Sequence, residues 1–465
     1  MKHSLARLTG LLIVLMLALS GCNLIAVDPI MQIDEDLAAL QKDYSAVVAT
    51  YEGGEVTKED VIANFLYQYS YYSYMYSYLG GSMDSQTLES IKQSTVEAAV
   101  QNAAIAKQFD ELGLTLDEDK LAEVQELADE TYQQAYDTYY ANTDGDTEEV
   151  RAKQTEYALY ADGYTKDQIY AMSLDQAKYE AVEEKVFSEI TEVTEEELNA
   201  AYEEKVAADE ETYADAPGSF ESAMTGESPA YWMPEGYRTV KHILLIPEED
   251  VLNAMKDAQT ALNDAQSKLT ELEDELAALN DEDAEDTAES EEEPRSAEEI
   301  QADIDQAQAE IEPLTADLEA AEAACVVNVQ DKVDEIYAKI EAGEDFNALI
   351  EEYGEDPGME NEPTKTRGYY VCADSTNWDE NFTRGAMLLE KVGDISETPV
   401  VGSSGIHIIR YESDVTPGAV SLDEVRDALT EATLETKRLD HFNAELTAWV
   451  EALNPQYDTS SLTVE

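Results

Sequence analysis

Two short apolar segments constrain the fold of this chain more than any other feature of its sequence. They are residues 240–245, VKHILL, and residues 405–410, GIHIIR, and each holds a histidine within a run of aliphatic residues. Short apolar runs rich in β-branched residues predict buried strands. The chain has only four histidines, so His242 and His407, at matching places in two strands, indicate one shared site.

The N-terminus has the pattern of an export signal. Lys2 and Arg7 precede the apolar run 11–19, which is as long as a signal-peptide core and too short to span a bilayer. The run ends in LSGC at residues 19–22, which resembles the bacterial lipobox. We therefore expect a signal peptide over 1–21, a lipid on Cys22 and a tether over 22–43 at the outer face of a cell membrane. The alternative is an ordinary signal peptide followed by a chance cysteine.

The composition limits the partners. With 104 acidic and 28 basic residues, the net charge of −76 argues against nucleic acid and anionic lipid headgroups. A chain of 465 residues indicates two or three domains. The spacing of Cys325 and Cys372 does not indicate a disulfide, and we expect buried or free thiols.

Residues 44–195 predict a mostly helical domain, with a strand and turn before residue 57, a cap made by Thr57 and Asp60, and a break at 112–115. Within it, tyrosines at 67, 71, 74 and 78 mark one helix face, and tyrosines at 69, 72 and 76 mark a second. Helical spacing predicts that one face packs in the core. An exposed face would suit a surface that accepts varied apolar sequences. A calcium loop around Gly145 is excluded, because an EF-hand register would place Tyr140 and Arg151 at ligand positions.

Residues 196–236 are expected to link two domains, since a short helix to about residue 206 precedes a stretch rich in Gly, Pro, Ser and aromatics. Farther on, residues 251–325 hold two heptad series joined by an acidic loop at 280–296. They predict an antiparallel coiled-coil hairpin with a bend at Pro313. Such an insertion is expected to leave its host domain intact.

With the hairpin set aside, the region between the two histidine strands predicts helices at 329–342, 346–353 and 382–389. It also holds the motifs IEAGEDF at 340–346 and VGDIS at 392–396. These motifs and the histidine strands resemble the parvulin-type peptidyl-prolyl isomerase domain. The resemblance implies an isomerase domain over 237–415, built on a small antiparallel sheet with surrounding helices.

The plan of the whole chain resembles the extracytoplasmic foldases of the PrsA and SurA kind, in which a helical chaperone domain precedes the isomerase domain and a C-terminal helix returns to it. The resemblance implies an α+β chain in which residues 416–465 complete the helical domain. A lipid anchor favours the PrsA type. Dimerisation through the helical domain is left open.

The resemblance also assigns site residues. Catalytic positions fall on His242, Asp356, Ser404 and His407, and proline-binding positions fall on Trp378, Phe382 and Met387. Rotation about an X-Pro bond needs neither metal nor cofactor, because the catalyst has only to favour the twisted amide over the planar one. The histidines could equally be structural, each satisfying the other in the core.

One segment departs from the family. Its Gly-Gly-Asp-Leu-Gly sequence is RGYYV here, at 367–371, and a valine for the last glycine is expected to narrow the loop beside the pocket. Two function classes therefore stay open: an isomerase that speeds proline-limited folding of secreted proteins, and a weak or inactive isomerase that acts as a holdase for unfolded exported proteins. A third reading is an adhesin or assembly factor that uses the hairpin as an arm.

Overall fold

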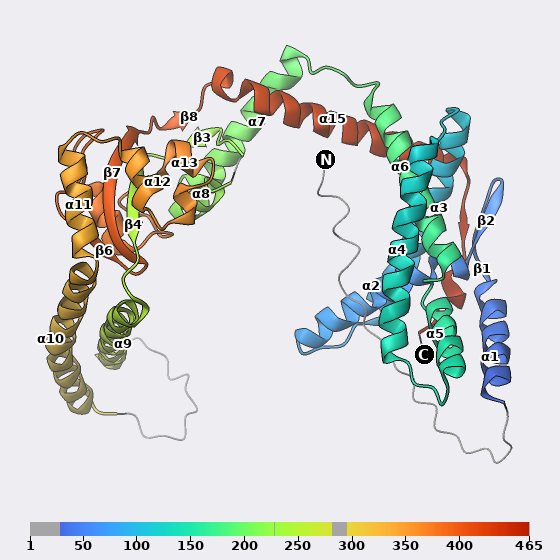
Figure 1. Ribbon diagram of the computed structural model, residues 1–465, viewed down its shortest axis with the longest axis horizontal. Helices are drawn as coiled ribbons and strands as arrows, with labels where there is room; N and C mark the ends of the chain where they lie inside the picture. The colour runs from blue at the N-terminus through green and yellow to red at the C-terminus, as the bar shows by residue number, and fades with distance from the viewer. Residues whose placement is uncertain (1–27, 227, 281–294, 465) are drawn as a thin grey trace. The chain divides into compact units, whose positions relative to one another are not determined.

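The computed structural model describes residues 28–226, 228–280 and 295–464 (Figure 1). They form two compact units: Met1–Val193 with Ala432–Glu465, called unit 1, and Thr194–Glu431, called unit 2. Helices and small antiparallel sheets make up both units, so the predicted α+β class is confirmed. The predicted signal peptide and Cys22 lie outside the described residues.

Unit 1 begins with a helix where a tether was predicted. Helix α1 spans Pro29–Tyr44, and the carboxylate of Asp28 caps it by accepting a hydrogen bond from the Ile30 amide at 3.0 Å. Ile33 and Tyr44 are buried, and Leu37 and Leu40 pack against the core of the unit. The prediction of a tether was therefore wrong for residues 29–43, because their apolar positions recur at helical spacing among the charges that suggested a solvated segment.

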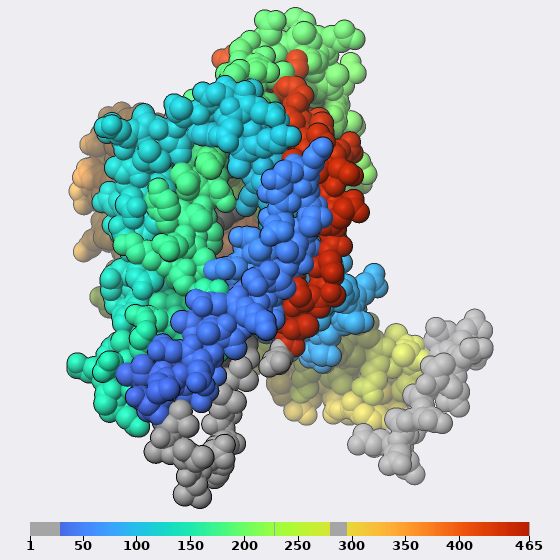
Figure 2. Space-filling model, turned by 90° about the vertical axis from the view of Figure 1, so that its right-hand side faces the viewer, coloured from blue at the N-terminus to red at the C-terminus, as the bar shows by residue number. Residues whose placement is uncertain are grey.

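A three-stranded sheet joins the two ends of unit 1. Strands β1 (Val47–Tyr51) and β2 (Gly54–Thr57) form a hairpin, and β9 (Gln456–Tyr457) pairs with β1. In Figure 2 the blue N-terminal part of this unit borders the red C-terminal part, where β1 pairs with β9. The 3-10 turn η3 (Thr459–Ser461) follows β9. Closure by the C-terminal residues fixes the far end of the chain into the core around Val48 and Leu462.

Five further helices complete the N-terminal part of unit 1. They are α2 (Lys58–Tyr78), α3 (Ser85–Glu111), α4 (Glu118–Asn142), α5 (Glu148–Ala161) and α6 (Lys166–Phe187). The predicted cap is present at the start of α2, where Asp60 accepts a hydrogen bond from the Thr57 amide at 2.7 Å. The break predicted at 112–115 separates α3 from α4.

Neither tyrosine face of α2 is buried. The four tyrosines of the first face, Tyr67, Tyr71, Tyr74 and Tyr78, are all exposed, and Tyr78 keeps 78% of its accessible area. On the second face Tyr72 is exposed, while Tyr69 and Tyr76 are partly buried. The prediction that one face packs in the core was wrong, because only the first two turns of the helix, with Val61, Ile62 and Phe65, reach the core.

The long helix α15 (Leu422–Ala452) supplies the C-terminal part of unit 1 from Ala432 onward. Phe442 is 1% exposed and packs edge-on against Tyr179 and Phe187 of α6 and its own neighbour Trp449. This aromatic cluster is the core contact that ties the returning helix to α6.

Truncation of Phe442 should therefore destabilise unit 1. We expect Phe442→Ala to lower its free energy of unfolding by about 3–5 kcal/mol, the usual loss when a buried phenylalanine leaves a cavity. Leu439→Ala is the matched control, since Leu439 lies on the same helix and is 41% exposed. Urea denaturation followed by tyrosine and tryptophan fluorescence measures both. Equal stability of the two variants would show that α15 does not complete the core.

Unit 2 is built around a four-stranded antiparallel sheet in the order β5-β4-β7-β6. The central strands β4 (Arg238–Leu245) and β7 (Gly405–Asp414) contain the two histidine segments and pair along their length. The edge strands are β5 (Tyr369–Val371) and β6 (Val400–Gly402). In the register His242 lies opposite Ile409 and Leu244 lies opposite His407, so the two histidines are diagonal neighbours on one face of the sheet.

Each face of this sheet has its own core. Helices α11 (Gln330–Glu341) and α12 (Phe346–Tyr353) cover one face and bury Ile336 and Leu349 with Ile243 and Ile408. Helix α14 (Glu380–Met387) packs on the opposite face, which holds the histidines. Two short elements, η2 (Pro357–Met359) and α13 (Thr364–Arg367), connect α12 to β5.

The predicted linker is a packed part of unit 2. Residues 195–223 form α7 (Glu195–Tyr213) and α8 (Pro217–Ala223), and β3 (Trp232–Met233) pairs with β8 (Gly418–Ala419). Phe220 is fully buried among Tyr213, Tyr237 and Tyr370. The linker prediction was wrong because its aromatic residues, read as loop residues, bury one another against strand β5.

The two predicted hairpin arms are helices α9 (Glu249–Asn280) and α10 (Ala297–Asn328), which pack against each other, with Leu272 facing Ile300 and Ile304. Helix α10 runs unbroken through Pro313. The base of the hairpin is not separate from its host, because Leu252, Met255, Leu318 and Cys325 belong to the same buried cluster as the sheet. The host sheet is intact across the insertion, as expected, but both ends of segment 251–325 pack into the host core. Most of the predicted connecting loop lies outside the described residues.

Candidate functional site

A chain of buried polar groups lies on the α14 side of the sheet. His407 Nδ1 is 2.9 Å from His242 Nδ1, and His242 Nε2 is 2.7 Å from the Oδ2 atom of Asp356. Both imidazoles are buried, while the Asp356 side chain keeps 19% of its accessible area. The structure thus brings together three of the four predicted catalytic residues, although their separation in sequence is up to 165 residues.

Local backbone geometry holds Asp356 in place. It caps η2, where its Oδ1 atom accepts a hydrogen bond from the Gly358 amide at 2.9 Å. The amide of the preceding residue, Glu355, donates to the carbonyl oxygen of Leu244 at 2.9 Å. The loop after α12 is therefore attached to strand β4, two residues from His242.

The carboxylate of Asp356 is strongly favoured in its ionised form. Burial by itself would raise the pKa of Asp356, but hydrogen bonding and charge from His242, together with the Gly358 amide and the Tyr369 hydroxyl, lower the pKa to about 2. An ionised carboxylate only accepts hydrogen bonds, so His242 Nε2 is the donor in this pair. Asp356 thus orients the first imidazole.

His407 is held neutral. Burial, followed by the charge of His242, lowers the pKa of His407 to about 3, and Asp356 opposes the change. A neutral imidazole carries one N–H, and the contact with His242 uses the Nδ1 atom. His407 Nε2 is buried and has no hydrogen-bond partner among the described residues.

An aromatic cluster covers the histidine pair. The Phe382 ring meets both imidazoles edge to face, with centroids 5.2 Å from His242 and 5.1 Å from His407. Trp378 lies 4.5 Å from Tyr369, centroid to centroid, and its indole N–H donates to the carbonyl oxygen of Tyr370 at 2.7 Å. Phe382 is 4% exposed, whereas Trp378 is only partly buried. Trp378 is therefore the more accessible ring of the cluster.

The remaining predicted residues differ in their placement. Met387 is partly buried and packs on the cluster that contains Phe382 and Val371. Ser404 lies in the exposed turn between β6 and β7, and its hydroxyl takes no part in the hydrogen-bond network recorded for the described residues. Its predicted catalytic role has no contact to support it.

The sequence reasoning missed Tyr369. Its hydroxyl donates to the Oδ2 atom of Asp356 at 2.9 Å, and burial, then the charge of Asp356, raise its pKa. The segment around it is strand β5 and not a loop. Val371 is fully buried beneath Phe382, so it does not narrow a pocket. The glycine that remains, Gly368, has a φ of +85°, and a Cβ there would meet the Val240 carbonyl. The departure of RGYYV from the family pattern was the available signal, because it adds a hydroxyl beside Asp356.

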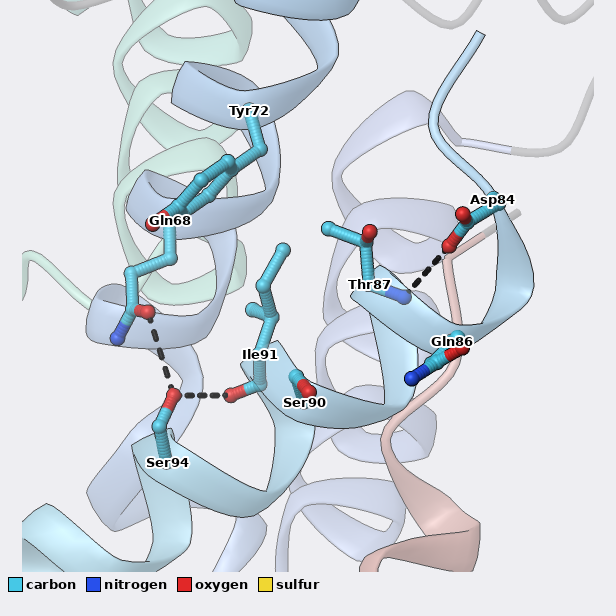
Figure 3. A pocket seen from close by; sticks show the side chains of 8 residues that line it. All are labelled: Gln68, Tyr72, Asp84, Gln86, Thr87, Ser90, Ile91 and Ser94. Atoms are coloured by element: carbon cyan, nitrogen blue, oxygen red, sulfur yellow. Dashed lines mark hydrogen bonds between the residues drawn. The ribbon is translucent and has the colours of Figure 1, made fainter.

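Other features of the described residues bear on ligands. Cys325 and Cys372 are buried free thiols, as expected. Among residues 28–226, 228–280 and 295–464, no group of three or more histidine, cysteine or acidic side chains could hold a metal ion. A hollow of about 470 Å³ lies in unit 1 between α2 and α3 (Figure 3), and it is lined mainly by polar residues: Gln68, Tyr72, Asp84, Gln86, Thr87, Ser90, Ile91 and Ser94.

Comparison with known proteins identifies the domain that holds this site. Residues 314–413 match the family model described as rotamase, the PPIC-type PPIase domain. The match includes Asp356, Phe382 and His407, while His242 precedes it and joins them through strand β4.

Curated relatives and solved structures are similar to parts of the chain. Two proteins named Foldase protein PrsA, from two type A strains of Clostridium botulinum, are each 27% identical over 130 residues, which are 27% of this chain and 37% of the relative. A structure of SurA-like chaperones from Campylobacter jejuni is 14% identical with a TM-score of 0.21, covering 90% of this chain and 99% of the other. A PrsA structure from Bacillus anthracis is 12% identical with a TM-score of 0.17, covering 78% and 99%.

The low pKa of His407 makes the stability of unit 2 depend on pH. Because His407 takes up a proton at about pH 3 when folded and near pH 6.5 when unfolded, acidification from pH 6.5 to 3 favours the unfolded state. The loss is roughly 1.4 kcal/mol for each unit of pKa difference. The lowered pKa of Asp356 adds stability that is present above its unfolded value, near 3.9, and lost only as pH falls toward 2.

We therefore expect His407→Asn, which keeps a side-chain amide near Nδ1 but cannot titrate, to lose less stability than wild type between pH 7 and pH 4. Urea midpoints of unit 2 at the two pH values measure the difference. His441→Asn is the matched control, because His441 lies on α15 in unit 1. The same acid sensitivity in wild type and His407→Asn would contradict the assignment of a neutral, buried His407.

Proposed function

Because the chain carries a PPIC-type peptidyl-prolyl isomerase domain, we propose that it is an exported foldase that catalyses cis/trans isomerisation of X-Pro bonds in secreted proteins. Its substrates are unfolded or partly folded secreted chains. The relatives support the class of activity, although the match spans only 37% of their length. A lipid on Cys22 would hold the protein at the outer face of the cell membrane. No helix of the described residues is long and apolar enough to cross a membrane.

The observation that carries the proposal is the chain His407–His242–Asp356 beneath an aromatic cluster. The barrier to X-Pro rotation, about 18–20 kcal/mol, comes from amide resonance. A site lowers it by binding the twisted amide more tightly than either planar form. We propose that Trp378, Phe382 and Met387 form an apolar pocket for the proline ring. The hydrogen-bonded chain His407–His242–Asp356 lies beside this pocket and supplies fixed polar groups.

The hydrogen-bonded chain acts on the substrate through its charge distribution. Asp356 supplies a fixed negative charge at the partly exposed end of the chain, next to the site. The imidazoles fix the position of that carboxylate and present their edges to the Phe382 ring. Preorganised groups of this kind act without rearrangement during the reaction. No covalent step and no cofactor enter the mechanism.

The test is exchange NMR on a short peptide with one X-Pro bond, which needs no coupling protease. We expect wild type to accelerate exchange, and Phe382→Leu, Asp356→Ala and His407→Asn each to lose roughly 10-fold or more of kcat/KM, because each displaces a group that positions the substrate. Tyr337→Phe is the matched control: its hydroxyl donates to the Ser396 carbonyl, and its ring packs in the core on the α11 side of the sheet, opposite to the face that holds the histidines. The proposal would be contradicted if the peptide exchanged between cis and trans at the same rate with the wild-type protein as without it.

A second candidate function, a holdase, is favoured by the exposed tyrosines of α2. Tyrosine combines a large apolar ring with a hydroxyl, so a row of them can contact diverse unfolded segments. The hollow beside this helix, which Tyr72 and Gln68 line on the α2 side (Figure 3), offers hydroxyl and amide groups to the backbone of a bound chain. The holdase and isomerase functions are compatible, since they use different units.

Aggregation of an unfolded model protein tests the holdase function. We expect wild type to suppress light scattering, and the combined variant Tyr67→Ser, Tyr71→Ser, Tyr74→Ser and Tyr78→Ser to lose most of that effect while keeping its isomerase activity. The control is Leu121→Ser with Leu127→Ser, two exposed apolar residues on α4 in the same unit. If the tyrosine variant and the control protect equally, α2 is not the binding surface.

A further inference from the structure

One carboxylate outside the predicted site connects two of its parts. Asp379 accepts hydrogen bonds from the amides of Asn381 at 3.0 Å and Phe382 at 3.2 Å, the second and third residues of α14. Its second oxygen accepts a hydrogen bond from the Ser403 amide at 3.0 Å, in the turn between β6 and β7. We propose that Asp379 is a positioning residue, which fixes the helix that carries Phe382 to the turn that leads into His407.

The turn between β6 and β7 is closely packed against both Asp379 and His407. A Cβ added at Gly402 would lie 3.0 Å from His407 Nε2 and 3.1 Å from Asp379 Oδ1. The Cβ position of Gly402 therefore faces both the carboxylate and the imidazole, and a side chain there would crowd both groups. A shift of Asp379 changes the packing at this glycine and so the space beside His407, because close-packed groups cannot move independently.

Helix α14 depends on this cap more than a longer helix would. It has eight residues, Glu380–Met387, and helices this short are not stable without caps and tertiary contacts. At its C-terminal end the Arg238 guanidinium donates to the Ala386 carbonyl at 3.2 Å, and Phe382 and Ala386 pack against Val240 and Ile409. Apolar contacts are not directional and Arg238 holds the far end of the helix, so the three hydrogen bonds of Asp379 direct the N-terminal turn that carries Phe382.

The N-terminal turn of α14 also meets the hairpin. The carboxyl of Glu322, on α10, hydrogen-bonds the side chain of Asn381, and burial raises its pKa, with Arg384 opposing the change. Asp379 and Glu322 thus lie in the same acidic surrounding. The two carboxylates repel each other, and a neutral residue at 379 removes this repulsion. A loss of activity in an Asp379→Asn variant therefore cannot result from added electrostatic repulsion.

The inference builds on the proposed isomerase activity, and its experiment separates the two functions of Asp379. Asparagine is as good a helix cap as aspartate, but an amide has one acceptor oxygen, so Asp379→Asn keeps the cap and loses the bond to the turn. Ser403→Pro removes the same bond from the other side, because proline has no N–H and suits the second residue of a four-residue turn, which Ser403 occupies between the paired Gly402 and Gly405. We expect both variants to lower kcat about 10-fold in exchange NMR, with KM changed less than about 2-fold.

The matched control is Asp345→Asn. Asp345 caps α12 in the same unit by accepting a hydrogen bond from the Ala348 amide at 3.1 Å, and it is exposed. Its replacement should leave kcat and KM at wild-type values. Wild-type kcat in both Asp379→Asn and Ser403→Pro would overturn the proposal, as would an equal loss in Asp345→Asn.

A second measurement is independent of turnover. Amide hydrogen exchange of Ser403 and Phe382 reports the linkage itself: Asp379→Asn should speed exchange at Ser403 by at least about 10-fold and leave Phe382 protected, whereas Asp379→Ala should speed both. Unchanged protection of Ser403 would contradict the inference. If wild type fails to accelerate X-Pro exchange but Ser403 protection responds as described, the proposed activity is wrong and the positioning contact stands.

Discussion

The antiparallel pairing of β4 with β7 is the contact on which the rest of unit 2 depends. It places His242 diagonal to His407, and it separates the two cores that lie on the faces of the sheet. The edge strands, α14 and the loop with Asp356 are all attached to these two strands. A register shift by one residue would place the two imidazoles on opposite faces of the sheet, and the one that turned toward Ile336 and Leu349 would enter an apolar core. The hydrophobic pattern of two short segments therefore determines whether the polar chain can form.

The site shows how a buried polar network reaches a single arrangement. Asp356 is ionised and accepts from three groups, so its hydrogen-bonding capacity is largely used. His407 is neutral and meets only one partner. Solvent accessibility is higher at the partly exposed carboxylate of Asp356 than at the two buried imidazoles. Such a gradient keeps charge at the partly exposed end of the chain and leaves the interior uncharged, which avoids the cost of burying an unpaired ion.

The sequence predicted those parts of the fold that follow from periodicity. Alternation and heptads gave the histidine strands and the two hairpin arms, and the family motifs gave Asp356 and Phe382. Periodicity did not indicate Tyr369, for which the departure of RGYYV from the family pattern was the only signal, or the contact of Asp379 with Ser403, which depends on a turn 24 residues farther along the chain. Helix α1 and the aromatic linker were misread because local charge or glycine content suggested solvated chain, while burial came from residues far along the sequence, such as Leu453 and Tyr370. For the tyrosines of α2 the error was the opposite one: burial was predicted and exposure is observed. Helical spacing alone does not show whether another element packs against a face.

Both units are closed by residues near the C-terminus. Strand β7 completes the sheet begun by β4, and α15 with β9 completes the core begun by α1 and β1. Contacts of such long sequence separation form late, because the loops between them must close first. During synthesis unit 2 therefore cannot finish folding before β7 has been made, and unit 1 cannot finish before β9 has been made. A protein proposed to assist unfolded chains is thus itself an incompletely folded chain until these strands are available.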